Sequence, residues 1–132
     1  MATEAELVGE LERLRACVAQ VTGALVVGDD GRVLARDISG EHPHHLGPRA
    51  AEALRTALRL AAAAGHGTAR ELLVRADHGW VGAYTAGRSA ALVLVTAPQA
   101  NVGRLRLEAL RSSTRISALI DGAPEQQENS RP

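Results

Sequence analysis

One segment constrains the fold of this 132-residue chain more than any other: residues 21–35, with the sequence VTGALVVGDDGRVLA. Two short apolar runs flank Asp29-Asp30-Gly31, where glycine takes a positive φ without strain and aspartate side chains bond to nearby backbone. The segment therefore predicts a β-hairpin with strands near 23–28 and 32–37. Turn formation explains both aspartates, so they give no support to a paired-carboxylate catalytic site.

An amphipathic helix is predicted directly before the hairpin, over residues 4–20. Its apolar positions recur at steps of four and three residues: Leu7, Leu11, Leu14 and Val18. Thr3 and Glu6 form the capping-box pattern that marks the start of a helix, because each side chain bonds to the other's backbone N–H.

A polar loop at 38–47 and a second helix at 48–64 are expected after the hairpin. Pro48 suits a first helical turn, where its missing N–H costs nothing, and Gly65 suits a left-handed C-terminal cap. The helix carries a smooth apolar stripe: Ala50, Ala53, Leu54, Ala57, Leu58, Ala61 and Ala64. Charged residues lie on its other side: Arg49, Glu52, Arg55 and Arg59.

Three strands and a third helix complete the predicted order. The strands are expected at 69–76, 80–86 and 90–96, and the helix, capped by Asn101, at 102–120. Residues 90–96 are almost all apolar, so this strand is expected at the centre of a sheet, covered on both faces. We expect one domain over residues 1–121 and a disordered polar tail at 122–132.

This order of helices and strands resembles the roadblock family of dynein-light-chain-like and bacterial GTPase-regulating domains. The resemblance covers about residues 4–121 and is carried by five segments: 21–27, 30–35, 70–74, 79–87 and 101–105. It implies a profilin-like α/β fold of the α+β type. In such a fold a central five-stranded antiparallel sheet has the second helix on one face and the first and third helices on the other.

The resemblance also implies a function. Such domains generally form homodimers by pairing the third strand edge to edge, with the two second helices side by side. Bacterial members are adaptors or activating proteins of small Ras-like GTPases, bind through the surface around the paired helices and carry no catalytic side chain. On this chain, the resemblance points to four partner-binding residues: Arg49, Glu52, Arg55 and Arg59.

The residues favour a dimer on independent grounds. A strand at 69–76 on a sheet edge would expose unpaired backbone groups, which proteins either protect or use. Charges on this strand either protect the edge or pair across a two-fold axis, because Glu71 and Arg75 are self-complementary in an antiparallel pair. The predicted dimer interface comprises Arg70, Glu71, Leu73 and Arg75 with Ala57 and Ala61 of the second helix.

Composition argues against several classes of function. Lys+Arg and Asp+Glu each total 15, giving zero formal net charge, whereas nucleic-acid-binding domains usually carry a basic stripe. No apolar run approaches the ~20 residues that span a bilayer, and the single cysteine, Cys17, fits a reducing compartment. The chain has no lysine and no glycine-rich phosphate loop. We therefore expect a cytoplasmic protein that binds neither nucleic acid, membrane, nucleotide nor any other cofactor.

The remaining candidate residues have simpler interpretations. Four histidines stand in or beside polar loops: His42, His44, His45 and His66. No cysteine accompanies them, so a solvent-exposed loop is expected rather than a metal site. Cys17 is expected to be a packed structural cysteine, since it lies near the C-terminal end of its helix. Trp80 and Tyr84 share one face of a strand and are expected to pack against a helix.

Two alternatives stand beside a GTPase-binding adaptor: a ligand-sensing module and a structural dimerisation scaffold without a GTPase partner. A sensor needs an enclosed pocket, and an alanine-rich core with only 2% aromatic residues favours solid packing instead. An enzyme would need a convergent polar cleft, for which the sequence gives no signal.

Overall fold

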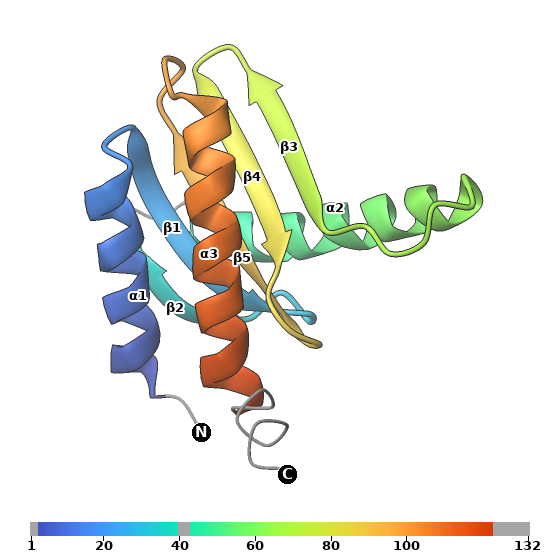
Figure 1. Cartoon of the computed structure of the whole chain (residues 1–132), viewed down its shortest axis with the longest axis horizontal. Helices are drawn as coiled ribbons and strands as arrows, with labels where there is room; N and C mark the ends of the chain where they lie inside the picture. Colours follow the sequence, from blue (N-terminus) through green and yellow to red (C-terminus); the bar gives the residue numbers. More distant parts are fainter. Residues whose placement is uncertain (1–2, 40–42, 123–132) are drawn as a thin grey trace, which may run out of the picture.

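The fold is that of a computed structural model, which describes residues 3–39 and 43–122. Its elements follow the predicted order (Figure 1): α1 (Glu4–Cys17), β1 (Val21–Gly28), β2 (Val33–Asp37), α2 (Pro43–Ala63), β3 (Glu71–Ala76), β4 (Gly79–Thr85), β5 (Ala90–Thr96) and α3 (Val102–Asp121). The tail predicted at 122–132 lies, apart from Gly122, outside the described residues.

The five strands form one antiparallel sheet in the order β2-β1-β5-β4-β3. The apolar strand β5 is central, as predicted, and β2 and β3 form the two edges. Helices α1 and α3 cover one face and α2 crosses the other (Figure 1). The predicted sheet with helices on both faces is therefore confirmed.

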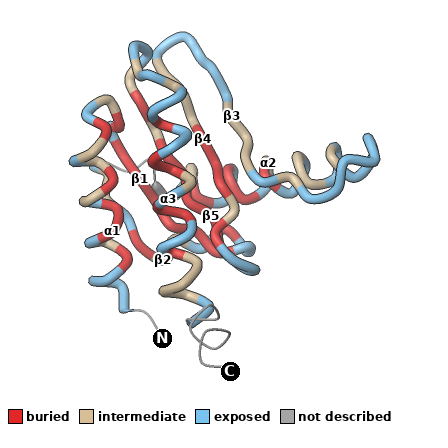
Figure 2. Tube along the Cα trace, viewed as in Figure 1, coloured by how far each residue is buried: buried red, intermediate tan, exposed pale blue. Residues whose placement is uncertain are grey.

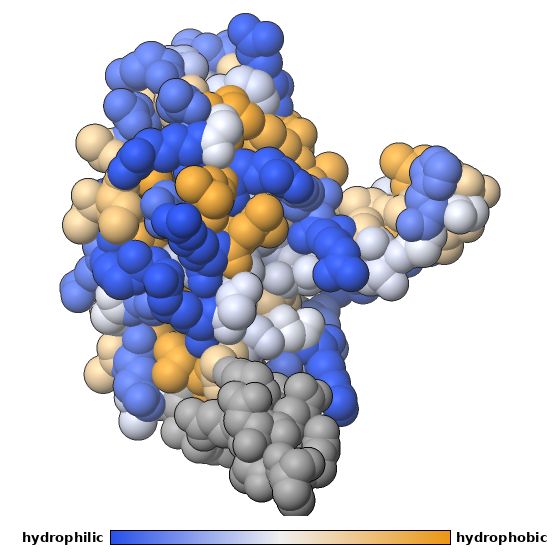
Figure 3. Space-filling model, in the orientation of Figure 1, coloured by the Kyte–Doolittle hydropathy of each residue, from blue (hydrophilic) through white to orange (hydrophobic). Residues whose placement is uncertain are grey.

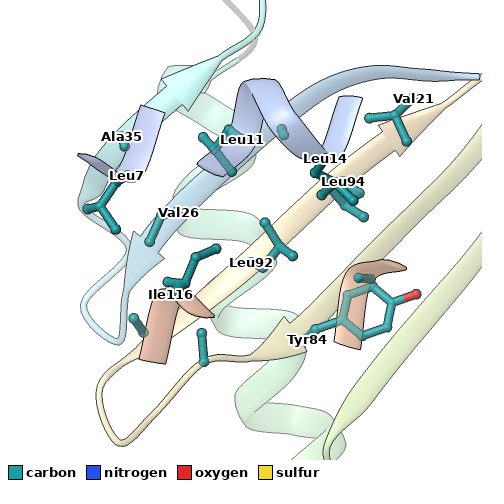
Figure 4. Close-up of a cluster of buried hydrophobic side chains, with 14 of the residues drawn as sticks. Leu7, Leu11, Leu14, Val21, Val26, Ala35, Tyr84, Leu92, Leu94 and Ile116 are labelled. Atoms are coloured by element: carbon teal, nitrogen blue, oxygen red, sulfur yellow. The ribbon is translucent and has the colours of Figure 1, made fainter. Parts of the chain in front are cut away.

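Each face of the sheet has its own apolar core. Figure 4 shows the larger one, where α1 and α3 meet the sheet: Leu7, Leu11, Leu14, Ile116, Val26, Leu92, Leu94 and Tyr84 are among its residues. The smaller one, under α2, includes Leu54, Leu25 and Val93. Successive side chains of a strand point to opposite faces of the sheet, so neighbouring residues such as Leu92 and Val93 belong to different cores.

The first helix begins as predicted and ends earlier. Thr3 caps α1 with the full capping box, in which Thr3 Oγ1 accepts from the Glu6 N–H and Glu6 Oε1 accepts from the Thr3 N–H. The expected end at residue 20 is wrong, because the helix ends at Cys17 and Val18 is already extended. The Val21 N–H then donates to the Val18 carbonyl, a tight turn that leads the chain into β1.

The second helix begins five residues before the predicted start, since α2 runs from Pro43 rather than from Pro48. The expected loop at 38–47 is therefore wrong for its second half. Close packing holds these early turns on the hairpin: a Cβ on Gly31 would come within 2.8 Å of Pro48 Cα, and Gly31 has a φ of 87°. Glycine permits this approach, and it brings α2 against the β1–β2 turn.

A buried carboxylate joins α1 to α3. Glu10 is only 9% exposed, accepts hydrogen bonds from Arg13 Nη2 at 2.7 Å and Ser112 Oγ at 2.8 Å, and lies 3.5 Å from Arg115 Nη1. Burial pushes the pKa of Glu10 up, but these hydrogen bonds and the charges of Arg13 and Arg115 outweigh it, so the pKa lies below its usual range. The carboxylate therefore stabilises the α1–α3 contact as long as it is ionised.

Acidification is expected to weaken this contact. Because the folded-state pKa of Glu10 lies below the unfolded value of about 4.3, its stabilisation is complete above that value and is lost as pH falls through the folded pKa. We expect Glu10→Gln to lower the free energy of unfolding by about 1–3 kcal/mol near pH 7 and by less near pH 3. Urea unfolding of this variant, beside the exposed control Glu12→Gln, measures both values; equal losses at the two pH values would contradict the assignment.

Candidate functional site

Helix α2 is longer than the face of the sheet that it crosses. Its C-terminal end projects beyond the edge strand β3, and exposure rises along it (Figures 1 and 2). Ala51 and Leu54 near its middle are 5% and 7% exposed, whereas Leu60, nearer its C-terminal end, is 71% exposed. The predicted apolar stripe is therefore present, and Ala57, Leu58 and Ala61 in its second half are half-buried, whereas Leu60, which lies outside the stripe, is exposed. The projecting arm shows apolar surface in Figure 3.

The four predicted partner-binding residues are all exposed on α2. Arg49 Nη1 lies 3.4 Å from Glu52 Oε1, but these side chains are 80% and 61% exposed, so the pair adds little stability. Arg59 Nη2 donates to the Thr56 hydroxyl at 3.4 Å. Arg55 instead donates to the carbonyl oxygen of Asp29 and thereby ties α2 to the β1–β2 turn.

These four residues do not form a single line on the helix. At about 100° per residue, Glu52 and Arg59 point in nearly the same direction, away from the sheet, while Arg49 and Arg55 lie about 120° apart. Arg49 therefore belongs to one flank of α2 and Arg55 to the other. The sequence prediction did not separate these flanks.

The edge strand β3 carries its predicted interface residues on the face covered by α3. Its odd-numbered residues share this face, and Glu71 Oε2 pairs with Arg106 Nη2 at 2.9 Å. The Arg75 guanidinium lies 5.6 Å from the centre of the Trp80 ring. Leu73, between them, is half-buried, and Arg70 is exposed just before the strand. Both charges predicted to pair across a two-fold axis thus have partners within the chain.

An apolar row that the sequence analysis missed crosses the opposite face of the sheet. Val74, Val81 and Val95 face one another across β3, β4 and β5, and Val74 is 46% exposed. At the far end, Val95 pairs with Gly23, over which the side chain of Ile38 lies. A surface hollow of 440 Å³ is lined by Val81, Val95 and Ile38 together with His45, Leu46 and Arg49 of α2. Finding this row requires the strand register, which the sequence pattern does not specify.

The aromatic pair divides between core and surface. Tyr84 is 1% exposed under α3, and burial, reinforced by the charge of Glu71, raises its pKa to about 12. Trp80 is half-buried beneath Arg75. Core packing, as predicted, is therefore the role of Tyr84, whereas Trp80 forms a cation–π contact near the end of the sheet.

Three of the four candidate histidines lie in the described chain, at the two ends of α2. His44 and His45 are exposed on the first turn of α2, His66 follows its end about 30 Å away, and His42 lies outside the described residues. Among residues 3–39 and 43–122, no three His, Cys, Asp or Glu side chains come together as metal ligands would. Cys17 is half-buried, with its sulfur 3.6 Å from Arg13 Nη1.

A further property concerns the length and polarity of the helices. Within the described part of the chain, no helix is both long and apolar enough to cross a bilayer.

Comparisons with known proteins agree with this architecture. A family model described as "Roadblock/LC7 domain" matches residues 7–96. Two uncharacterized proteins of Methanocaldococcus jannaschii are each 33% identical to this chain over 101 residues, which is 76% of this chain and 88% of theirs.

Solved structures show the same fold. The gliding protein MglB of Thermus thermophilus has a TM-score of 0.82 at 22% identity, covering 89% of this chain and 90% of that one. A Roadblock/LC7 domain from Streptomyces avermitilis has a TM-score of 0.78 at 18% identity, covering 83% and 92%. At these identities the likeness concerns the fold alone.

Proposed function

Because this chain belongs to the Roadblock/LC7 domain family, we propose that it is a cytoplasmic homodimeric adaptor that binds a small Ras-like GTPase and has no catalytic residues of its own. The observation that carries the proposal is the projecting half of α2, where Leu60 is 71% exposed and Ala61 half-buried in the described chain while the outer side is charged. The exposed apolar residues suit association with another copy of this chain, and the charged outer side suits a polar partner.

Geometry supports a dimer built around β3. In the described sheet, β3 has β4 on one side and no strand on the other, so its outer backbone groups are open to pairing. Helix α2 crosses the sheet beside Leu72, and the uncovered Val74 lies two residues further along β3. A two-fold axis through an antiparallel β3–β3 pair places the end of β3 that α2 crosses in one copy beside the Val74 end of β3 in the other copy.

The α2 of a second copy would therefore lie over this apolar row, in which Val74 is exposed and Val81 and Val95 are half-buried. Its projecting apolar side would cover Val74, Val81 and Val95, and the same contact would be made reciprocally. A 540 Å³ hollow between α2 and β3, lined in part by Ala53, Ala57 and Leu72, lies where the two helices would run side by side. Ala57 and Ala61, predicted as interface residues, suit this arrangement because small side chains let helices approach closely.

The GTPase is proposed from the family resemblance and from the outer side of α2. In the dimer described above, the two helices would present Glu52 and Arg59 of both copies on one continuous surface. These side chains are exposed. The adaptor would act by binding one nucleotide state of the GTPase more tightly than the other, which shifts the GTPase toward that state.

Charge reversal on α2 is expected to abolish GTPase binding. Arg55→Glu combined with Arg59→Glu places two negative charges where the partner is proposed to dock, and like charges across an interface are strongly unfavourable. The tagged protein is used to capture proteins from native lysate, once in the presence of a GTP analogue and once in the presence of GDP. The captured GTPase is then purified and its affinity is measured. We expect binding in one nucleotide state for the wild type and none for the double variant.

A matched control reverses two arginines away from α2, Arg36→Glu and Arg111→Glu, and is expected to retain the wild-type affinity. Light scattering verifies that every variant is still a dimer. A folded dimer that retains no GTPase in either state would contradict the adaptor function and favour a structural dimerisation scaffold. Unchanged affinity in the double variant would contradict the assignment of Arg55 and Arg59.

A further inference from the structure

A small pocket lies where the flank of α2 that carries Arg55 meets two turns of the sheet. The Asp29 N–H of the β1–β2 turn donates to the Ser89 carbonyl of the β4–β5 turn at 2.9 Å, so the two turns lie side by side. The hydrogen bond from Arg55 to the Asp29 carbonyl then fixes the helix over them. Three separate segments of the chain thus hold the pocket in shape.

The pocket has an apolar floor and a basic rim. Its floor is formed by buried or half-buried aliphatic residues: Ala51, Leu54, Leu58, Ala90 and Ala91. Arg55, Arg88 and the exposed Asp29 also line it, and neither guanidinium forms an ion pair with a carboxylate of the described residues. Two cations and one carboxylate leave this rim with a net positive charge in a chain whose formal net charge is zero, which favours an occupant that is aliphatic and negatively charged at its margins.

The size of the pocket selects the kind of occupant. Its volume is 90 Å³, whereas an apolar cavity that admits benzene measures about 150 Å³ and sites for small-molecule ligands about 300–1,000 Å³. One aliphatic side chain fits such a space, and a metabolite does not. This size therefore favours a protein partner over the ligand of a sensor.

The pocket would remain open in the proposed dimer. Its α2 residues, among them Ala51 and Leu58, lie on the opposite flank of the helix from Ala53 and Leu60, which line the hollow on the dimer side. A protein that docks on the outer side of α2 would reach the pocket beside Arg55.

We propose that this pocket anchors one aliphatic side chain of a partner protein, in a segment that carries a carboxylate on each side of that residue. The carboxylates pair with Arg55 and Arg88 at the rim. That the partner is the GTPase rests on the proposed function, whereas the chemistry of the occupant rests on the pocket itself. Residues that contribute strongly to an interface lie in desolvated pockets, surrounded by contacts that exclude water.

A blocked peptide tests the pocket without any GTPase. The ¹⁵N-labelled full chain is titrated with acetyl-Asp-Leu-Glu-amide to millimolar concentration, beside acetyl-Asn-Leu-Gln-amide and acetyl-Asp-Ala-Glu-amide. We expect the first peptide to shift the amide signals of Gly28, Ser89 and Ala91, and each control to bind at least about tenfold more weakly.

Two substitutions link these shifts to the pocket. Ala51→Leu fills the floor and is expected to abolish the shifts, and Arg88→Glu, on an exposed turn, is expected to weaken binding at least about tenfold. Ala62→Leu and Arg36→Glu are the matched controls and should leave binding unchanged. Absence of shifts in the wild type, or shifts that persist in both pocket variants, would overturn the proposal.

Two further measurements distinguish this proposal from occupation of the pocket by the chain's own residues and from the proposed GTPase binding. If removing residues 123–132 alone changes the same amide signals, the chain's own segment occupies the pocket and the proposal is wrong. With a purified GTPase, Ala51→Leu should weaken binding at least about tenfold while the dimer persists. Peptide binding without any GTPase binding would support the anchor and overturn the proposed function, whereas GTPase binding that Ala51→Leu leaves unchanged would overturn the anchor alone.

Discussion

Replacing Leu60 with glutamate is expected to convert the protein in solution from a dimer into a folded monomer. Leu60 is 71% exposed on the projecting half of α2 and belongs to neither of the two apolar cores formed by the described residues. In the proposed dimer it is buried against the second copy, where an unpaired carboxylate costs about 2 kcal/mol or more. Two-fold symmetry doubles this cost, so the dimer dissociation constant should rise about a thousandfold.

Sedimentation equilibrium measures this change, and circular dichroism establishes that the helix content is kept. Leu107→Glu is the matched control, because Leu107 is also an exposed leucine, at 50%, but lies on α3 across the sheet from α2. The control is expected to remain a dimer. Should Leu60→Glu dimerise as tightly as the wild type, the projecting half of α2 is not part of the interface.

Replacing Gly79 with alanine is expected to destabilise the fold by about 3 kcal/mol or more. Gly79 begins β4 with a φ of 153°, a conformation that residues with a Cβ rarely adopt. A Cβ at this position would overlap the carbonyl oxygen of Thr96 at the end of β5. The variant must therefore separate β4 from the central strand locally, and both strain and lost sheet pairing contribute to the cost.

Urea unfolding of the two proteins measures the difference. Gly9→Ala provides a control of opposite sign, because nothing lies within 4 Å of a Cβ at Gly9 in α1. That substitution should stabilise the protein by about 0.5–1 kcal/mol, since alanine loses less entropy than glycine in a helix. A Gly79→Ala variant as stable as the wild type would show that the end of β5 moves aside at little cost.

The order and layering of the fold were predictable because local patterns specify them. The apolar run at 90–96 identified the central strand, and the caps at Thr3 and Asn101 marked where two helices begin. These features depend on residues close together in the sequence. The resemblance then supplied the arrangement of helices on the two faces of the sheet, which the structure confirms.

Other features depend on contacts between distant segments, and the sequence did not reveal them. The start of α2 was misplaced because Pro43 and Pro48 are equally suitable first-turn residues, and the packing of Gly31 against Pro48 is visible only in three dimensions. Glu10 belongs to the polar side of α1 by pattern, yet Ser112 on α3 makes it a buried group. Likewise, the apolar row across the sheet exists only once the register joins Val74 to Val81 and Val95.

The pairing of β1 with β5 has a consequence for how the chain is made. Gly28 in β1 pairs with Ala90 in β5, so the apolar centre of the sheet closes only after most of the protein has left the ribosome. Pairings between such distant segments form slowly, and an apolar strand with an open edge is prone to aggregate until its partner strand has been synthesised. A nascent chain that stalls before β5 would therefore expose β1 and need protection by a chaperone.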